Sequence, residues 1–300
     1  MTKNGIINVI KPPGMTSYQV VARIKRIFDM KKVGHTGTLD PAAAGVLPIC
    51  LGKATRVIPY MQEEEKEYIG ELTLGVTSDT LDAEGKILNR NKGWHKLRIS
   101  DLEEVLTEFK GRIKQIPPMY SAIHHQGKRL YELAREGKKV ERKAREVVIS
   151  KIKILDFEPP VVRLKINCSR GTYIRSLAAD IGKKLEIGAI LSFLIRMCSG
   201  PFKLEGAYTL EEIDQKRDDS LLPLDFPLNY PALIIKKSAE KKAVNGAPLY
   251  RGDFKEIPLE LVEDKKVLIY NEEGLFISIN KIEIKKLPNF ICSPVRVFSG

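Results

Sequence analysis

Hydrophobic spacing in the first third of the chain predicts a helix, a loop and a strand. Apolar residues at positions 20, 21, 24, 27 and 28 recur at helical period, and Thr16 or Ser17 can cap the start of this helix. Gly and Pro residues from Gly34 to Gly52 then predict a loop held close to a core. From Tyr68 to Val76, apolar or small residues alternate with polar ones, which predicts a half-buried strand followed by a polar turn.

The middle of the chain shows two more helical patterns and a second strand. Ser100 and Glu103 form a capping-box pattern before one apolar helical repeat. Alternation over residues 162–168 predicts a strand, after which the spacing becomes helical and Thr172 is the expected N-cap. Arg175 then falls in the first turn, where a cation opposes the helix dipole, so we expect a compensating anion nearby.

The last quarter of the chain has a different pattern. Prolines at positions 223, 227 and 231 mark a predicted domain boundary. Beyond them lie short strand patterns, including residues 266–270 and 275–279, joined by a polar turn. About 70 residues of this kind suit a small β-barrel, so two domains are expected.

Charge and composition narrow the functional classes. The chain holds 50 Lys and Arg against 38 Asp and Glu, a net charge of +12, which favours polyanionic partners and nucleic acid first among them. That the charge only keeps the protein soluble stays open. The densest basic stretch, residues 126–153, carries ten Lys or Arg against four Glu.

The cysteines and the hydropathy pattern indicate an intracellular setting. Cys50, Cys168, Cys198 and Cys292 lie far apart without a C-x-x-C pair, so we interpret them as reduced core thiols. No stretch approaches the roughly 20 apolar residues of a membrane span, and the N-terminal apolar patch is short. The expected location is the cytoplasm, with no membrane association.

Residues 32–56 form the segment richest in candidate chemistry. They place one carboxylate, Asp40, and one imidazole, His35, in a glycine-rich stretch flanked by cations. Asp before Pro is also a common turn former, so these residues alone leave a structural role for Asp40 open. A phosphate-binding P-loop is excluded because Gly45 and Gly52 are separated by six residues. A zinc hydrolase site is not expected, since the four histidines form no H-E-x-x-H motif.

Several motifs together carry a family resemblance. GHTGTLDP followed by AAGVLPICLGKATR resembles the signature of the TruB family of tRNA pseudouridine synthases. Further blocks resemble the same family in the same order: KPPGMTS, EKEYIGELTLGVTSDTLDAEG, IPPMYSAIHHQGKRLYELAREG and CSRGTYIRSLAADIG. The C-terminal section with NGAPL resembles the family's PUA domain. The resemblance spans nearly the whole chain.

The resemblance implies both a fold and a reaction. The expected fold is α+β, with a catalytic domain over residues 1–228 on a mixed, largely antiparallel sheet and a PUA-like barrel over residues 229–300. The implied reaction converts a T-loop uridine of tRNA, at position 55, into pseudouridine after base flipping. Neither a cofactor nor a metal is expected. The implied partner is tRNA, bound by its T-arm and its acceptor end, with no obligatory protein partner; assistance in tRNA folding is a further possibility.

The resemblance also implies site residues. Asp40 matches the essential aspartate, acting as nucleophile or as base. Tyr68 matches a tyrosine that stacks on the base, and Tyr173 and Arg175 match the tyrosine and arginine of the family's last catalytic motif, where the arginine pairs with the aspartate. His35 matches a histidine that enters the RNA loop.

Other residues receive weaker assignments from their motif context. Met197 stands where the family often has a leucine beside the base. Lys11 and Lys128 are expected to face RNA or to have structural roles. His124 and His125 are candidates for facing RNA, with an ordinary surface role left open.

Two alternatives remain beside this hypothesis. A non-catalytic RNA-remodelling protein would keep the scaffold but predicts a damaged active site, whereas the matched residues are all present. A synthase directed by guide RNA is less favoured because the chain lacks long charged tails. Asp79 and Asp82 are expected to shape a turn, since a second catalytic carboxylate has no clear task.

Overall fold

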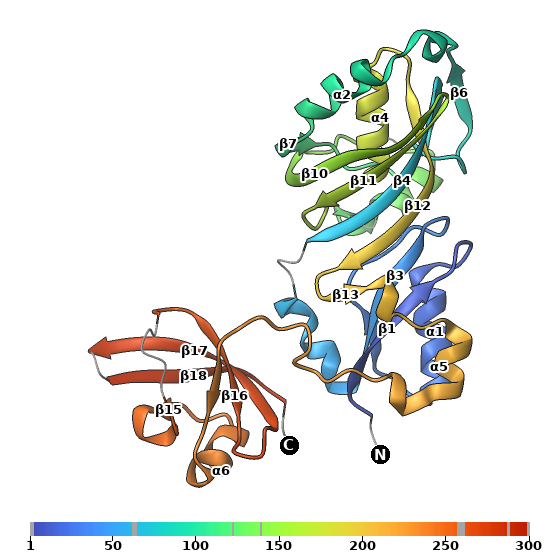
Figure 1. Cartoon of the computed structure of the whole chain (residues 1–300). Helices are drawn as coiled ribbons and strands as arrows, with labels where there is room; N and C mark the ends of the chain where they lie inside the picture. Colours follow the sequence, from blue (N-terminus) through green and yellow to red (C-terminus); the bar gives the residue numbers. More distant parts are fainter. Residues whose placement is uncertain are drawn as a thin grey trace. The chain divides into compact units, whose positions relative to one another are not determined.

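The chain divides into two compact units, Met1–Leu222 and Pro223–Gly300. Their secondary structure is drawn in Figure 1, a computed structural model that describes residues 3–61, 65–121, 123–138, 140–256, 262–286 and 289–298. The division falls at the first of the three prolines, a few residues before the predicted boundary at 228.

A nine-stranded mixed sheet is the centre of the first unit. Its main path runs β1 (Gly5–Lys11), β3 (Ala44–Leu51), β12 (Ala189–Ser199), β4 (Lys66–Leu74), β11 (Val161–Cys168), β10 (Arg145–Glu158) and β7 (Gly111–Gln115), while β2 (Val33–His35) pairs with β3 and β13 (Phe202–Lys203) with β12. Among the described strands of this sheet, β3 and β12 are the only pair that runs in parallel. Two small ribbons add β5 (Val76–Ser78) with β6 (Ile87–Arg90), and β8 (His124–His125) with β9 (Lys128–Arg129).

Helices cover this sheet and complete an α+β fold (Figure 1). They are α1 (Ser17–Phe28), α2 (Ile99–Glu108), α3 (Leu130–Arg135), α4 (Ile174–Lys184) and α5 (Leu210–Lys216). Short 3-10 turns occupy Gly52–Arg56, Ile58–Tyr60, Gly93–Lys96, Leu204–Gly206, Arg217–Ser220, Lys237–Ala239 and Arg251–Asp253. Apolar side chains of the strands pack with α1, α2 and α4 into one continuous core that includes Ile24, Leu72 and Ile181.

The second unit has its own small sheet and core. Its strands run in the order β14 (Ala232–Ile234), β16 (Lys266–Tyr270), β17 (Phe276–Lys286), β18 (Asn289–Val297) and β15 (Leu249–Tyr250), beside the short helix α6 (Glu240–Val244). Leu233, Ile269 and Phe290 are buried in the core. The predicted strand over residues 266–270 is confirmed, and the one over 275–279 is the start of the longer β17.

Several predicted elements are confirmed, whereas the predicted loop of residues 34–52 is wrong over its second half. Helix α1 begins after Thr16, whose hydroxyl accepts from the Gln19 backbone N–H, and β4 and β11 follow the predicted alternation. Within the predicted loop of residues 34–52, Ala44–Leu51 instead form β3, with every residue buried. A strand enclosed on both faces has a continuous apolar pattern, so the alternation that reveals half-buried strands is missing.

Two helix caps differ from the predicted ones. Helix α2 is capped at Arg98, because the Asp101 carboxylate accepts from the Arg98 backbone N–H and pairs with its guanidinium. Helix α4 has Tyr173 at its N-cap, while the Thr172 hydroxyl donates to the Ser169 carbonyl instead. Arg175 still falls in the first turn of α4, as predicted.

All four cysteines are free thiols, as predicted: Cys50, Cys168 and Cys292 are buried and Cys198 is half-buried. Burial raises the pKa of Cys50 to about 12, so this thiol stays protonated. None of the helices in the described ranges has the length and apolar composition needed to span a bilayer.

Close contact between β3 and β12 depends on Gly45. Its φ is +102°, and a Cβ added there would lie 2.2 Å from the carbonyl oxygen of Arg196. Gly45→Ala should therefore lower the free energy of unfolding by about 3 kcal/mol or more, through backbone strain and overpacking. Urea denaturation measures this change. Gly206→Ala is the matched control, because its added Cβ meets nothing within 4 Å, and equal midpoints for both variants would contradict the prediction.

Candidate functional site

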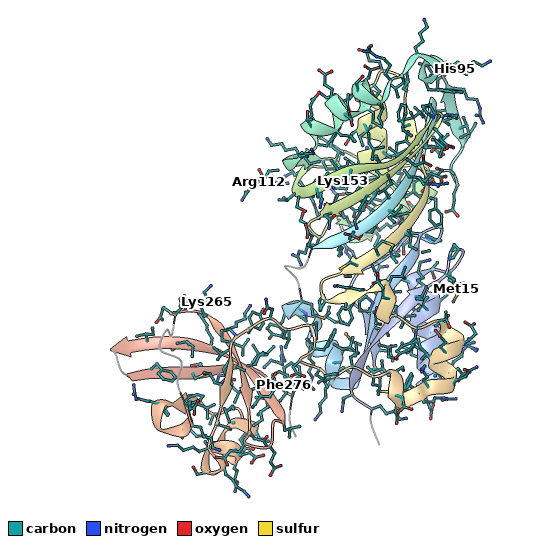
Figure 2. All side chains as sticks on the ribbon, in the orientation of Figure 1. Met15, His95, Arg112, Lys153, Lys265 and Phe276 are labelled. Carbon is teal, nitrogen blue, oxygen red and sulfur yellow. The ribbon has the colours of Figure 1, made fainter. Side chains whose placement is uncertain are left out.

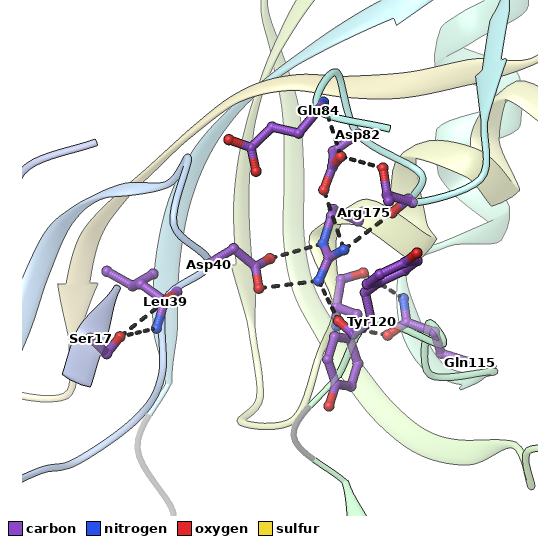
Figure 3. Close-up of polar contacts among 10 residues, drawn as sticks. Ser17, Leu39, Asp40, Asp82, Glu84, Gln115, Tyr120 and Arg175 are labelled. Atoms are coloured by element: carbon purple, nitrogen blue, oxygen red, sulfur yellow. Dashed lines mark hydrogen bonds and ion pairs between the residues drawn. The ribbon is translucent and has the colours of Figure 1, made fainter. Parts of the chain in front are cut away.

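An aspartate and an arginine from distant parts of the first unit form the centre of the site (Figure 3). Asp40 lies in the loop between β2 and β3, and Arg175 lies in the first turn of α4. Arg175 Nε is 2.8 Å from Asp40 Oδ2, and Nη2 donates to Oδ1 at 3.1 Å. This two-point contact supplies the anion that the helix-dipole argument predicted, and it fixes the plane of the carboxylate.

Further acceptors surround the Arg175 guanidinium, whose side chain is only 6% exposed. Nη1 donates to Asp82 Oδ2 at 3.2 Å and to the Thr80 carbonyl at 3.1 Å, and Nη2 donates to the Tyr120 carbonyl at 2.8 Å. Asp82 is in turn held by the Thr80 hydroxyl. The guanidinium is thus locked in one orientation toward Asp40.

Two residues of the KPPGMTS segment hold the Asp40 loop in place. The Ser17 hydroxyl donates to the Leu39 carbonyl at 3.1 Å and accepts from the Leu39 N–H at 2.9 Å. Lys11 is fully buried, and its ammonium donates to the carbonyls of Met15 at 2.6 Å and Pro41 at 3.0 Å. Burial lowers the pKa of Lys11 to about 8. Of its two predicted roles, the geometry favours the structural one.

A cavity of about 240 Å³ opens beside this ion pair. Asp40, Tyr68, Tyr173, Arg175, Lys66 and Leu194 are among its lining residues. Gln115 fixes the backbone of Tyr173 through paired hydrogen bonds, donating to the Tyr173 carbonyl at 3.0 Å and accepting from its N–H at 2.8 Å. The site therefore combines a carboxylate, two cationic side chains and two aromatic rings around one open space.

The Asp40 carboxylate is both accessible and electrostatically balanced. Its side chain retains 40% exposure, so a substrate in the cavity can reach it. Burial in the protein raises the pKa of Asp40 and nearby Asp82 raises it further, whereas the Arg175 guanidinium opposes the rise. Without that cation, the carboxyl group would hold its proton to a higher pH.

Two of the residues expected to contact the substrate, His35 and Met197, lie outside the cavity lining. His35 is in β2, where burial lowers the pKa of its imidazole, and among the described residues no atom pairs with its buried Nδ1. Met197 is half-buried in β12, while Leu194 of the same strand lines the cavity. Leu194 pairs with Gly70 of β4, whereas the pairing of β12 with β4 is irregular at Met197, between Arg196 and Cys198.

The basic middle segment lies at the surface. Lys128 is exposed in β9 and forms an ion pair with Glu136 at 2.8 Å, and His124 is exposed in β8; the side chain of His125 is outside the described part. Figure 2 labels Arg112 on β7 and Lys153 on β10, the last two strands in the sheet order, and both side chains are exposed. This surface has the charge expected for contact with a polyanion.

Comparison with known proteins decides the family. Residues 25–174 match the family model described as TruB family pseudouridylate synthase (N terminal domain). The chain belongs to the TruB family. The prediction from the motifs is thereby confirmed, and the chain is an enzyme, an isomerase that forms pseudouridine.

Similarity to TruB family members extends over nearly the full length. The chain is 45% identical over 304 residues to tRNA pseudouridine synthase B of Syntrophomonas wolfei, which covers 98% of each chain. It is 42% identical over 299 residues to the protein of the same name from Caldanaerobacter subterraneus, covering 99% of this chain and 100% of the other. A chain in a solved H/ACA RNP bound to a substrate RNA containing 2′-deoxyuridine has a TM-score of 0.76 at 28% identity, over 99% of this chain and 85% of that one.

The sequence interpretation of this TruB family member missed several residues at or near the site, including Lys66 and Leu194 of the cavity lining. Asp82 was assigned only to a turn, which it does shape by accepting from the Glu84 N–H, but it also holds Arg175. Ser17 was seen only as a helix cap. Arg196, fully buried in β12, was not considered. A cation among the apolar residues Leu194, Ile195 and Met197 was the available signal for Arg196.

Proposed function

We propose that this enzyme isomerises a uridine in the T-loop of tRNA, and that Asp40 is the residue the reaction cannot do without. The observation that carries the proposal is the Asp40 carboxylate at 2.8 Å from Arg175, in the wall of a cavity that Tyr68 also lines. Relatives that align over nearly the whole chain are named tRNA pseudouridine synthase B. Their name and the site chemistry together favour tRNA as the substrate.

The proposed reaction needs no added group. The C1′–N1 bond of uridine breaks, the base turns over, and a C1′–C5 bond forms; the proton lost from C5 is matched by the one gained at N1. Asp40 acts either as the nucleophile at the nucleoside or as the base at the sugar, and both roles require the ionised carboxylate. Arg175 favours that ionised form and holds it toward the cavity.

The uridine is proposed to reach Asp40 by leaving its stack in the RNA. Unstacking costs a few kcal/mol, and stacking on an aromatic ring returns about 1 to 3 kcal/mol per base. Tyr68 is the proposed stacking partner, with Leu194 providing apolar contact to the base in place of Met197. Tyr173, which lines the same cavity, would lie beside the same base.

Binding outside the cavity is proposed to depend on charge. The basic segment of residues 126–153 would contact phosphates and so position the RNA without reading its sequence. The five-stranded second unit is proposed to be a PUA-like domain that binds the acceptor end of tRNA. We propose that the enzyme acts without an obligatory protein partner.

An unmodified tRNA transcript tests the substrate proposal. Chemical mapping after incubation should find one pseudouridine, in the T-loop, and a transcript with cytidine at that position should remain unmodified. Modification at other uridines would contradict the proposal. An isolated T-arm stem-loop should be modified at the same site but with a KM raised about tenfold, because the contacts to the acceptor end are lost.

A further inference from the structure

Arg196 is a fully buried cation that the proposed reaction leaves without a task. It is 0% exposed in β12, and within the described ranges no carboxylate forms an ion pair with it. Burial lowers the pKa values of Lys11 and His35, and the charge of Arg196 lowers both further. Burying a cation without a counter-ion near another buried cation is unfavourable for stability alone, which indicates a role in the site.

The backbone fixes where the Arg196 guanidinium lies. Its Nε donates to the Val46 carbonyl at 2.7 Å, and its Nη2 donates to the Gly37 carbonyl at 3.1 Å. Both acceptors belong to the segment that carries Asp40. The two donors are neighbouring nitrogens of one planar guanidinium, so the two hydrogen bonds set the orientation of that group. A lysine ammonium could not reproduce this geometry.

Arg196 lies directly opposite Tyr68 in the sheet. The two residues are cross-strand partners in β12 and β4, so their side chains share one face and their Cβ atoms are close. The buried Nη1 has no hydrogen-bond partner among the described residues. Burial raises the pKa of Tyr68, and the Arg196 guanidinium opposes this rise, as expected for a cation beside the phenol hydroxyl.

We propose that Arg196 is a positioning residue that holds the Tyr68 ring at the wall of the cavity through the Tyr68 hydroxyl. The inference rests on the proposed role of Tyr68 as the surface on which the flipped base stacks. Arg196 itself does not line the cavity, so it acts on the substrate only through Tyr68. The Gly37 and Val46 carbonyls orient the guanidinium, and the guanidinium orients the phenol.

The test compares Arg196→Gln, Arg196→Lys and Tyr68→Phe with the parent enzyme on a tRNA transcript. Arg196→Gln should lower kcat about 30- to 100-fold with KM changed less than about threefold, because a misplaced ring affects the reacting geometry rather than the RNA surface. In the Tyr68→Phe background the same change should lower kcat less than about threefold, since the hydroxyl through which Arg196 acts is absent. Arg163→Lys, an exposed arginine of β11, is the control and should keep parental activity.

A spectroscopic readout separates this role from simple destabilisation. In fluorotyrosine-labelled protein, the Tyr68 signal, assigned by its loss in Tyr68→Phe, should shift in Arg196→Gln while the signals of the other nine tyrosines remain. Arg196→Lys keeps the charge but loses the fork, so it should show a smaller shift and serves if Arg196→Gln does not fold. An unmoved Tyr68 signal, or equal losses of kcat in both backgrounds, would overturn the inference. A parent enzyme that leaves tRNA unmodified would instead overturn the proposed function, and the fluorine spectrum would still report on the contact.

Discussion

Asp40→Asn is expected to form no measurable pseudouridine in tRNA, a loss of at least about 1,000-fold in kcat. The amide has nearly the shape of the carboxylate, yet it can neither attack the nucleoside nor accept a proton from it. Arg175 keeps its contacts with Asp82 and with the Tyr120 carbonyl, so the pocket should retain its form. Single-turnover assays with saturating enzyme measure the loss directly.

Two controls make the Asp40→Asn result specific. Asp79→Asn changes an exposed carboxylate that accepts only from the backbone N–H of Lys86 within the described structure, and it should retain parental activity. Affinity of Asp40→Asn for the same tRNA should stay within about threefold of the parent, because the variant changes one side chain of a large RNA surface. A variant with more than a tenth of the parental rate would remove Asp40 from the centre of the mechanism.

Arg175→Met is expected to lower kcat by about 100-fold or more at neutral pH and to move the acidic limb of the pH–kcat profile upward. Burial already raises the pKa of Asp40, and Arg175 is the principal group that opposes the rise. Removing the cation raises this pKa further, so a smaller fraction of Asp40 is ionised at any given acidic pH. Raising the pH should recover part of the activity. A pH–kcat profile in which kcat falls but the acidic limb does not move would contradict this account.

Asp82→Asn should shift the acidic limb of the pH–kcat profile in the opposite direction. The Asp82 carboxylate raises the pKa of Asp40, so its removal should move the acidic limb to lower pH, although Arg175 is then held less firmly. Arg175→Lys keeps a cation near Asp40 but cannot make the contacts of a planar guanidinium. Its kcat should therefore lie between those of Arg175→Met and the parent enzyme. Stability of all three variants is compared by urea denaturation, since leaving a buried carboxylate without its partner destabilises a fold by roughly 3 to 5 kcal/mol.

Sequence patterns predicted the elements that have one buried face. Helix α1 and strands β4 and β11 follow their predicted periods, because each has one apolar and one polar side. Strand β3 was missed because it is enclosed throughout. The N-caps of helices α2 and α4 lie one or two residues from their predicted positions. Side chains such as Asp101 compete for the hydrogen bonds at the start of a helix.

Site residues that belong to a sequence motif could be predicted from the sequence. Residues that only the fold brings to the site could not. Asp40 and Arg175 were paired from the family resemblance, and the structure has them in contact. Asp82 lies 93 positions before Arg175, and no local pattern links the two. Leu194 lines the cavity and Met197 does not, and motif matching does not consider the irregular pairing of β12 at Met197.

The position of β12 in the sheet has a consequence for the way the enzyme is made. This strand, at residues 189–199, lies between β3, which follows the Asp40 loop, and β4, which carries Tyr68. On a translating ribosome, the two walls of the pocket have no strand to join them until β12 emerges from the exit tunnel. In a growing chain, the basic residues 126–153 are therefore made before the pocket beside Asp40 can be completed.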